Sequence, residues 1–178
     1  MGVFVLIVDL TPIPFFIESM LDWIKFKTRG LSAAEKILVE EVFGKKIPVH
    51  LIGMDTASIP AIKRKTVAYV IFHTINFDKT ISDTMLVHEL VHVWQYRRFG
   101  SVYITEALWA QKWGGGYNYG GLDALRKFCN DPGLSAFNFE QQADIIEEYY
   151  RWRKGIALQW SIQDVGIGEV LEKYVRCL

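Results

Sequence analysis

The amino-acid sequence predicts an α+β fold, in which a small mixed sheet packs on one central helix and further helices follow toward the C-terminus. Segments rich in β-branched and aromatic residues, the pattern of strands, occur before residue 78. From residue 82 onward, helix-capping residues precede long segments with helical spacing of apolar side chains. Strands grouped ahead of helices are typical of α+β domains.

Length and composition indicate one packed domain. The chain has 178 residues, of which 51% are apolar and 22% charged, so it can bury a sizeable core. We expect a single domain over residues 1–178, with residues 1–30 as an N-terminal arm of unassigned role. The 20 basic and 20 acidic side chains give a net charge of zero, without the basic footprint of a nucleic-acid-binding protein. Cys129 and Cys177 lack the paired spacing of a cysteine-based zinc site or a disulfide framework.

The chain begins with an apolar run from Val3 to Val8. Asp9, Pro12 and Pro14 interrupt it well before the roughly 20 residues that a membrane span needs. No basic region precedes the run and no small-residue cleavage site follows it, so a secretory signal is not expected and a cytoplasmic location is. The run is interpreted as a strand or packing arm, with membrane or partner contact as the alternative.

The first half of the domain is expected to hold a helix and two strands. Ser32 and Glu35 form a capping-box pattern that begins a helix, and Gly44 is a natural stop for it. Residues 47–53 and 66–77 are predicted strands, the second because β-branched and aromatic residues fill it.

The second half is expected to be helical, apart from a glycine-rich loop. Ser82 or Thr80 caps a helix that ends at Gly100. Asn138, with Gln141 three residues later, begins another long helix. The predicted helices cover residues 83–99, 101–113, 122–129, 138–154 and 161–175, and the loop covers residues 114–121.

Residues 88–92 read His-Glu-Leu-Val-His, an H-E-x-x-H motif on a predicted helix. Four-residue spacing places His88 and His92 on one face, about one turn apart, as two ligands of a single zinc ion (Zn2+) require. Glu89 then lies beside that face, where it can reach water held by the metal and act as general base. The alternative is a buried polar cluster without metal, because the surrounding helix is apolar on almost every side.

A third zinc ligand must come from elsewhere in the chain. His50 and His73 lie upstream on predicted strands, and no histidine follows His92. A carboxylate is therefore the natural candidate: Glu140 as third ligand, with Asp144 accepting the far N–H of a ligand histidine. Glu106, Asp123 and Glu147 remain alternatives, and the two acids could also belong to an ordinary solvated helix face.

This arrangement resembles the gluzincin group of zinc metallopeptidases, in which an E-x-x-x-D helix follows the motif. Several segments further resemble a bacterial metallopeptidase domain that also occurs as the core domain of proteins linked to extracellular contractile injection systems and of Vgr-related proteins. The similar segments are residues 31–35, 42–44, 74–77, 86–95 and 140–143. The resemblance implies a zincin-like fold, a glutamate as third ligand and an aspartate supporting a ligand histidine.

The expected function is zinc-dependent hydrolysis of a peptide or protein substrate, with Glu89 as general base. The strand predicted at residues 67–77 could pair with an extended substrate, as the resemblance implies, or serve only as sheet. Tyr117, Tyr119 and His73 are candidate donors to the oxyanion. The alternative function is a non-catalytic zinc-binding module, structural or cargo, with a partner in an injection or secretion system that could also deliver the protein.

Overall fold

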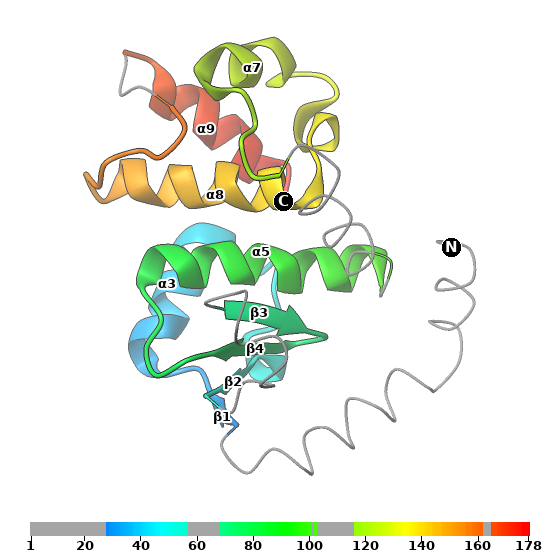
Figure 1. Ribbon diagram of the computed structural model, residues 1–178, viewed down its shortest axis with the longest axis vertical. Coiled ribbons are helices and arrows are strands. Elements are labelled where there is room, and N and C mark those ends of the chain that lie inside the picture. Colours follow the sequence, from blue (N-terminus) through cyan, green and yellow to red (C-terminus); the bar gives the residue numbers. More distant parts are fainter. Residues whose placement is uncertain (1–27, 57–67, 101, 103–115, 162–164) are drawn as a thin grey trace.

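A computed structural model describes residues 28–56, 68–100, 102, 116–161 and 165–178 (Figure 1). Over these residues the chain combines a four-stranded mixed sheet with five α-helices, which confirms the α+β class. The predicted N-terminal run and nearly all of the helix predicted at residues 101–113, with Glu106, lie outside the described residues. None of the described helices has the length and apolar character needed to cross a lipid bilayer.

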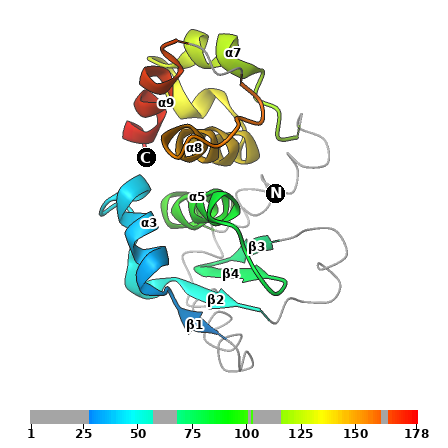
Figure 2. The ribbon, with the colours of Figure 1, turned by 90° about the vertical axis from the view of Figure 1, so that its left-hand side faces the viewer.

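The sheet has the strand order β1-β2-β4-β3. β2 and β4 pair in parallel, whereas the β1–β2 and β3–β4 pairs are antiparallel. Among the described strands β1 and β3 are therefore the outer ones, and β3 lies next to the helix α5 (Figure 2). The strands are β1 (Arg29–Gly30), β2 (Gly53–Asp55), β3 (Ala68–Ile71) and β4 (Thr74–Phe77).

Two strand predictions were wrong in extent. One strand was predicted at residues 66–77, but its described part, residues 68–77, is a hairpin whose chain reverses at Phe72 and His73. Phe72 has a φ of 55°, a conformation that bulky residues rarely adopt, and no glycine or asparagine marks the turn. Residues 47–53 hold a 3₁₀ helix (Val49–Leu51), and β2 begins only at Gly53.

Helix α3 (Ala33–Phe43) begins at the predicted capping box, in which Ser32 and Glu35 satisfy each other's backbone N–H. Helix α5 (Asp83–Phe99) is capped by the Ser82 hydroxyl and is followed by Gly100, as predicted. Every side chain from residue 86 to residue 95 is buried, because α5 is covered on more than one side.

The remaining helices pack together beyond α5. They are α7 (Gly121–Phe128), a 3₁₀ helix (Gly133–Ala136), α8 (Phe139–Arg153) and α9 (Ile167–Arg176). The capping box of Asn138 and Gln141 begins α8, as predicted. The predicted helix at residues 161–175 begins later than expected, at Ile167.

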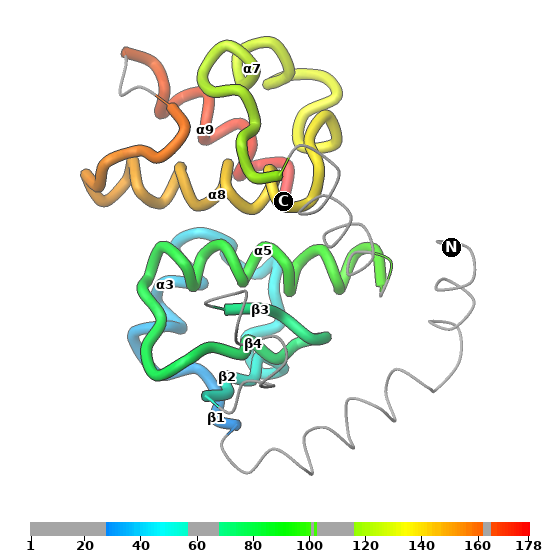
Figure 3. The backbone as a smooth tube through the Cα atoms, in the orientation of Figure 1, coloured from blue at the N-terminus to red at the C-terminus, as the bar shows by residue number. Residues whose placement is uncertain are grey.

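Helix α5 is the middle layer of the structure. The sheet and α3 lie on one side of it, and α8 lies on the other, with α7 and α9 beyond (Figures 1 and 2). Helices α5 and α8 run side by side in opposite directions (Figure 3). The H-E-x-x-H motif therefore faces a second helix across a buried interface, away from bulk water.

Candidate metal centre

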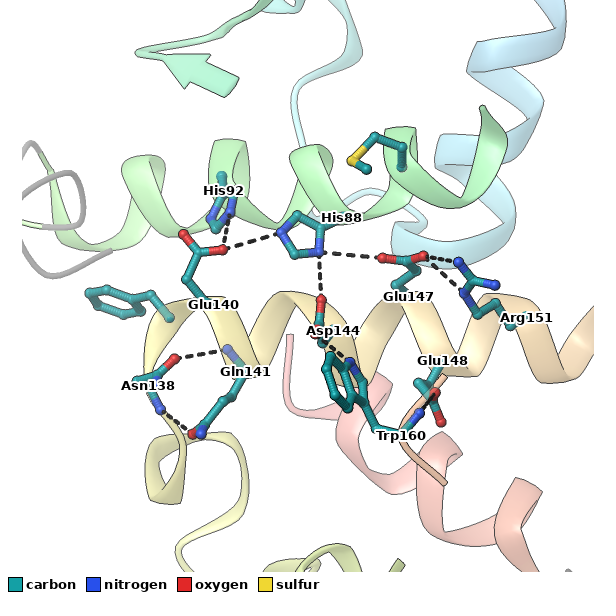
Figure 4. Close-up of polar contacts among 12 residues, drawn as sticks. His88, His92, Asn138, Glu140, Gln141, Asp144, Glu147, Glu148, Arg151 and Trp160 are labelled. Atoms are coloured by element: carbon teal, nitrogen blue, oxygen red, sulfur yellow. Dashed lines mark hydrogen bonds and ion pairs between the residues drawn. The ribbon is translucent and has the colours of Figure 1, made fainter. Parts of the chain in front are cut away.

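The two motif histidines lie on the side of α5 that faces α8 (Figure 4). His88 and His92 are each only 6% exposed, and their ring centroids are 5.0 Å apart. The four-residue spacing places the rings on neighbouring turns of one face, as the sequence predicted. Their polar nitrogens must therefore find partners within the protein.

Helix α8 presents a row of buried carboxylates to this interface. The row consists of Glu140, Asp144 and Glu147, all at most 6% exposed. Their spacing of four and three residues keeps them on one side of the helix. Buried ionised groups need a compensating charge or hydrogen bonds, so each member of this row should have a specific partner. Glu148 is also buried, but it points to the opposite side of α8, where it bonds Tyr119 and the Trp160 backbone (Figure 4).

Glu140 brings one oxygen to both histidines. Its Oε2 lies 3.4 Å from Nε2 of His88 and 3.5 Å from Nε2 of His92. A tetrahedral zinc ion about 2.0–2.1 Å from each ligand places neighbouring ligand atoms about 3.4 Å apart. Glu140 thus lies at this separation from each histidine, and the three groups together could hold a metal ion.

The other ring nitrogen of His88 is held by carboxylates. Its Nδ1 lies 2.9 Å from Oδ1 of Asp144 and 3.4 Å from Oε2 of Glu147. The opposite oxygen of Asp144 accepts a 2.6 Å hydrogen bond from the indole N–H of Trp160. Oε1 of Glu147 accepts two hydrogen bonds, of 2.7 and 2.9 Å, from the Arg151 guanidinium.

His88, Asp144 and Glu147 also lie close enough to one another to form a metal-binding group. If they bound a second ion, His88 would have to use both ring nitrogens as ligands and give up its last N–H. The 2.9 Å contact of Nδ1 with Asp144 instead has the length of a charge-assisted hydrogen bond. These two carboxylates are therefore better described as supports for His88 than as a second metal site.

The hydrogen bonds at Nδ1 determine whether each Nε2 atom carries a proton or a lone pair. Nδ1 of His92 lies 2.8 Å from Oε1 of Gln95, which is an acceptor. With Nδ1 donating in both neutral rings, each Nε2 presents a lone pair toward Glu140. Three acceptor atoms that converge in a buried place repel one another unless a cation lies among them. The residues present therefore fit a metal ion.

In the absence of an ion, the buried acids and histidines of the centre shift one another's pKa values. Burial by itself lowers the pKa of His88, but hydrogen bonds to Asp144, Glu140 and Glu147 raise the pKa well above its usual value. Burial likewise opposes the charge on Glu140, yet the two histidines hold the pKa of that carboxyl below its usual range. In the absence of metal, these shifts favour protons on the imidazoles as the positive charge that balances the carboxylates.

Glu89 differs from the other buried acids. It is 4% exposed, and among the described residues its Oε2 has no hydrogen-bond partner. Burial raises the pKa of Glu89 and outweighs the opposing influence of His92 and His88. A buried oxygen without a partner next to a candidate metal centre is placed to bind water or a substrate group.

The other candidate ligands lie apart from this centre. His50 and Asp123 are exposed, and His73 packs edge-on against the ring of Tyr96 at 5.0 Å. None of the three belongs to a potential metal-binding group of the described residues. Glu147 lies near the centre, but on the Nδ1 side of His88 rather than beside both Nε2 atoms.

The candidate oxyanion donors occupy different surroundings. The Tyr119 hydroxyl is buried, donates to Glu148 at 2.9 Å and lies 2.6 Å from the Ser161 hydroxyl. The Tyr117 ring lies 6.1 Å from the His88 ring and is 38% exposed. Burial, and after it the charge of Glu140, raises the pKa of Tyr117 to about 12, so its hydroxyl keeps its proton at neutral pH.

Sequence reasoning did not assign a role to several residues that support the centre. Gln95 follows His92 by three residues, and this helical spacing is the one local signal that could have indicated their contact. Trp160 reaches Asp144 from beyond the end of α8, and no local pattern predicts that contact.

No protein-family model matches the chain, and comparison with curated proteins and with solved structures finds no match.

Proposed function

We propose that the protein is a zinc-dependent peptide hydrolase of the gluzincin type. His88, His92 and Glu140 would hold the zinc ion, and Glu89 would act as general base. The observation that carries this proposal is the convergence of three buried ligand atoms, with Glu140 at tetrahedral spacing from each histidine, beside a Glu89 oxygen that has no partner among the described residues. Two nitrogens and one carboxylate oxygen are a ligand set of catalytic zinc sites with an open position.

Zinc in such a site polarises a peptide carbonyl and lowers the pKa of water to about 7. The proton transfers then fall to Glu89, whose carboxylate takes a proton from the attacking water and returns it to the leaving amine. Burial raises the pKa of Glu89 toward neutral pH, and a group whose pKa lies near the working pH can both accept and donate a proton. A metal site that served structure alone would have no need of a buried base without a partner.

The proposed substrate is a peptide or protein that binds in an extended conformation. Among the described strands β1 and β3 are the outer ones, and β3 lies against α5, the helix that carries the motif. A peptide that adds to a sheet as a further strand forms backbone hydrogen bonds whatever its side chains are. Such binding near the motif helix would favour a peptide or protein over a compact small molecule.

Tyr117 is the favoured donor to the oxyanion. Its ring lies beside His88, whereas the hydroxyl of Tyr119 is already engaged by Glu148 and Ser161. A tyrosine that keeps its proton can donate a hydrogen bond as negative charge develops on the carbonyl oxygen. His73 instead packs against Tyr96.

The decisive experiment compares three variants by zinc content and by turnover of a peptide library. Glu89→Gln should retain one zinc per chain and lose about 10²- to 10⁴-fold in turnover, because the amide cannot accept the proton. His88→Ala and Glu140→Ala should lose zinc and turnover together. Glu40→Ala, an exposed glutamate on α3, is the matched control.

Two results would contradict the proposal. Unchanged turnover by Glu89→Gln would remove Glu89 from the mechanism. A zinc-loaded wild type that cleaves no member of the library would instead favour the non-catalytic module, structural or cargo, as the function.

A further inference from the structure

We propose that Gln95 and Gln142 form an amide relay that decides which ring nitrogen of His92 faces the metal. The inference rests on the metal centre of the proposed function, but not on hydrolysis. Both are positioning residues, because they act on His92 rather than on a substrate. Their side chains are buried, Gln95 completely, so their hydrogen bonds must be satisfied within the protein.

The direction of the relay is set by a backbone carbonyl. The Phe137 carbonyl oxygen can only accept a hydrogen bond, and the Gln142 side chain lies 2.9 Å from it. Gln142 must therefore turn its NH₂ group toward Phe137. Its Oε1 is left to accept the 3.1 Å hydrogen bond from Nε2 of Gln95.

A second carbonyl sets the orientation of Gln95 independently. Nε2 of Gln95 also donates to the Phe139 carbonyl oxygen at 2.9 Å, so both of its hydrogens are used. Oε1 of Gln95 then faces Nδ1 of His92 at 2.8 Å. Since that oxygen has no hydrogen to give, Nδ1 must carry the proton.

The flipped orientation of the Gln95 amide is unfavourable because it would meet two acceptors. If the Gln95 amide were flipped, its oxygen would face the Phe139 carbonyl and the Gln142 oxygen without any hydrogen between them. Leaving buried acceptors unsatisfied costs about 1–3 kcal/mol for each group. The relay therefore selects the tautomer of His92 whose Nε2 lone pair points at Glu140.

The relay also connects His92 to the third candidate ligand. Phe139, whose carbonyl accepts from Gln95, is the residue directly before Glu140 in the first turn of α8. One amide thus contacts a histidine of α5 and the backbone that carries Glu140. Gln95 holds both groups in register across the interface between the two helices.

The test reads the tautomer of His92 directly by ¹⁵N–¹H NMR of the histidine rings in the zinc-loaded protein. The wild type should show Nδ1–H for His92 and for His88, both protected from exchange with water. Gln95→Met keeps the length of the side chain but removes the acceptor. This variant should lose the protection of Nδ1–H at His92 and retain it at His88. Zinc affinity, measured by chelator competition, should fall about 10- to 100-fold.

Gln95→Glu separates the two ends of the relay, because a carboxylate still accepts from Nδ1 but sets its second oxygen against the Phe139 carbonyl and the Gln142 oxygen. Its Nδ1–H signal should be that of the wild type, whereas its zinc affinity should stay below that of the wild type because the contact with the backbone that carries Glu140 is lost. Gln142→Met should weaken the protection less, since Gln95 keeps its hydrogen bond to Phe139. Gln159→Met, an exposed glutamine, is the matched control.

Two outcomes would overturn the relay. One is a zinc-loaded wild type in which His92 carries its proton on Nε2. The other is a folded Gln95→Met protein with an unchanged Nδ1–H signal and unchanged zinc affinity. A wild type that binds no zinc would contradict the proposed function itself, so the two failures are distinguishable.

Discussion

Nδ1 of His88 lies 2.9 Å from Oδ1 of Asp144, while Nε2 of the same ring faces Glu140 at 3.4 Å. The two acids are four residues apart on α8, so one helix face engages both nitrogens of a single imidazole (Figure 4). The ring is thereby fixed in orientation and in tautomer, as is usual for a histidine that binds a metal. If the centre binds zinc as proposed, its affinity should depend on Asp144, although Asp144 is not placed among the ligands.

Asp144→Asn should weaken zinc binding about 10- to 100-fold. An asparagine cannot accept from both neighbours: if its oxygen faces His88, its NH₂ group meets the Trp160 indole N–H, and the reverse orientation places the NH₂ group against His88. Chelator competition measures the loss. Asp123→Asn, at an exposed position, should bind zinc as the wild type does, and equal affinity of the two variants would contradict the role of Asp144.

Zinc binding should release protons at pH 7. Burial lowers the pKa of His88 and of His92, but their carboxylate neighbours more than compensate, so both pKa values lie above the usual 6.5 in the metal-free protein. Zinc requires neutral rings and must displace these protons. The apparent affinity should therefore keep rising with pH above 6.5, until pH passes the raised pKa values. At every pH below the raised pKa values, the apparent zinc affinity should fall as the pH is lowered.

Calorimetry in two buffers of different ionisation enthalpy counts the protons released by zinc. Two rings with the usual pKa of 6.5 would release about half a proton per zinc at pH 7, and the raised pKa values predict a larger release. A release of about half a proton or less would show that the pKa values are not raised.

Gly168→Ala should destabilise the packing of α9 on α8. A Cβ at this position would lie 2.0 Å from Cζ2 of Trp152, so the indole would have to move. Overpacking of this kind costs about 1–3 kcal/mol, more than the roughly 1 kcal/mol that alanine gains over glycine in a helix. Urea unfolding measures the difference. At Gly30 a new Cβ would meet nothing within 4 Å, so Gly30→Ala should leave the midpoint nearly unchanged, and an equal midpoint for both variants would contradict the steric argument.

Local signals predicted the helices better than the strands. The bounds of α5 follow from the Ser82 cap and from Gly100, and both capping boxes lie where the sequence placed them. These signals act over a few residues, so they can be read without knowledge of the fold. The hairpin at Phe72 has no such signal, because the pairing of β3 with β4 and the surrounding packing hold that residue at positive φ.

The sequence by itself determined that two imidazoles share one face of a helix and that two acids share one face of another, because helical periodicity is a local property. Which carboxylate meets which nitrogen was decided only by the tertiary structure. Glu140 reaches the Nε2 side of His88 across 52 residues of chain, and Trp160 returns to hold Asp144. The reason is physical: the register of α5 against α8 is set by packing of the whole interface, and burial then leaves each charged or polar group dependent on the partner that this register supplies.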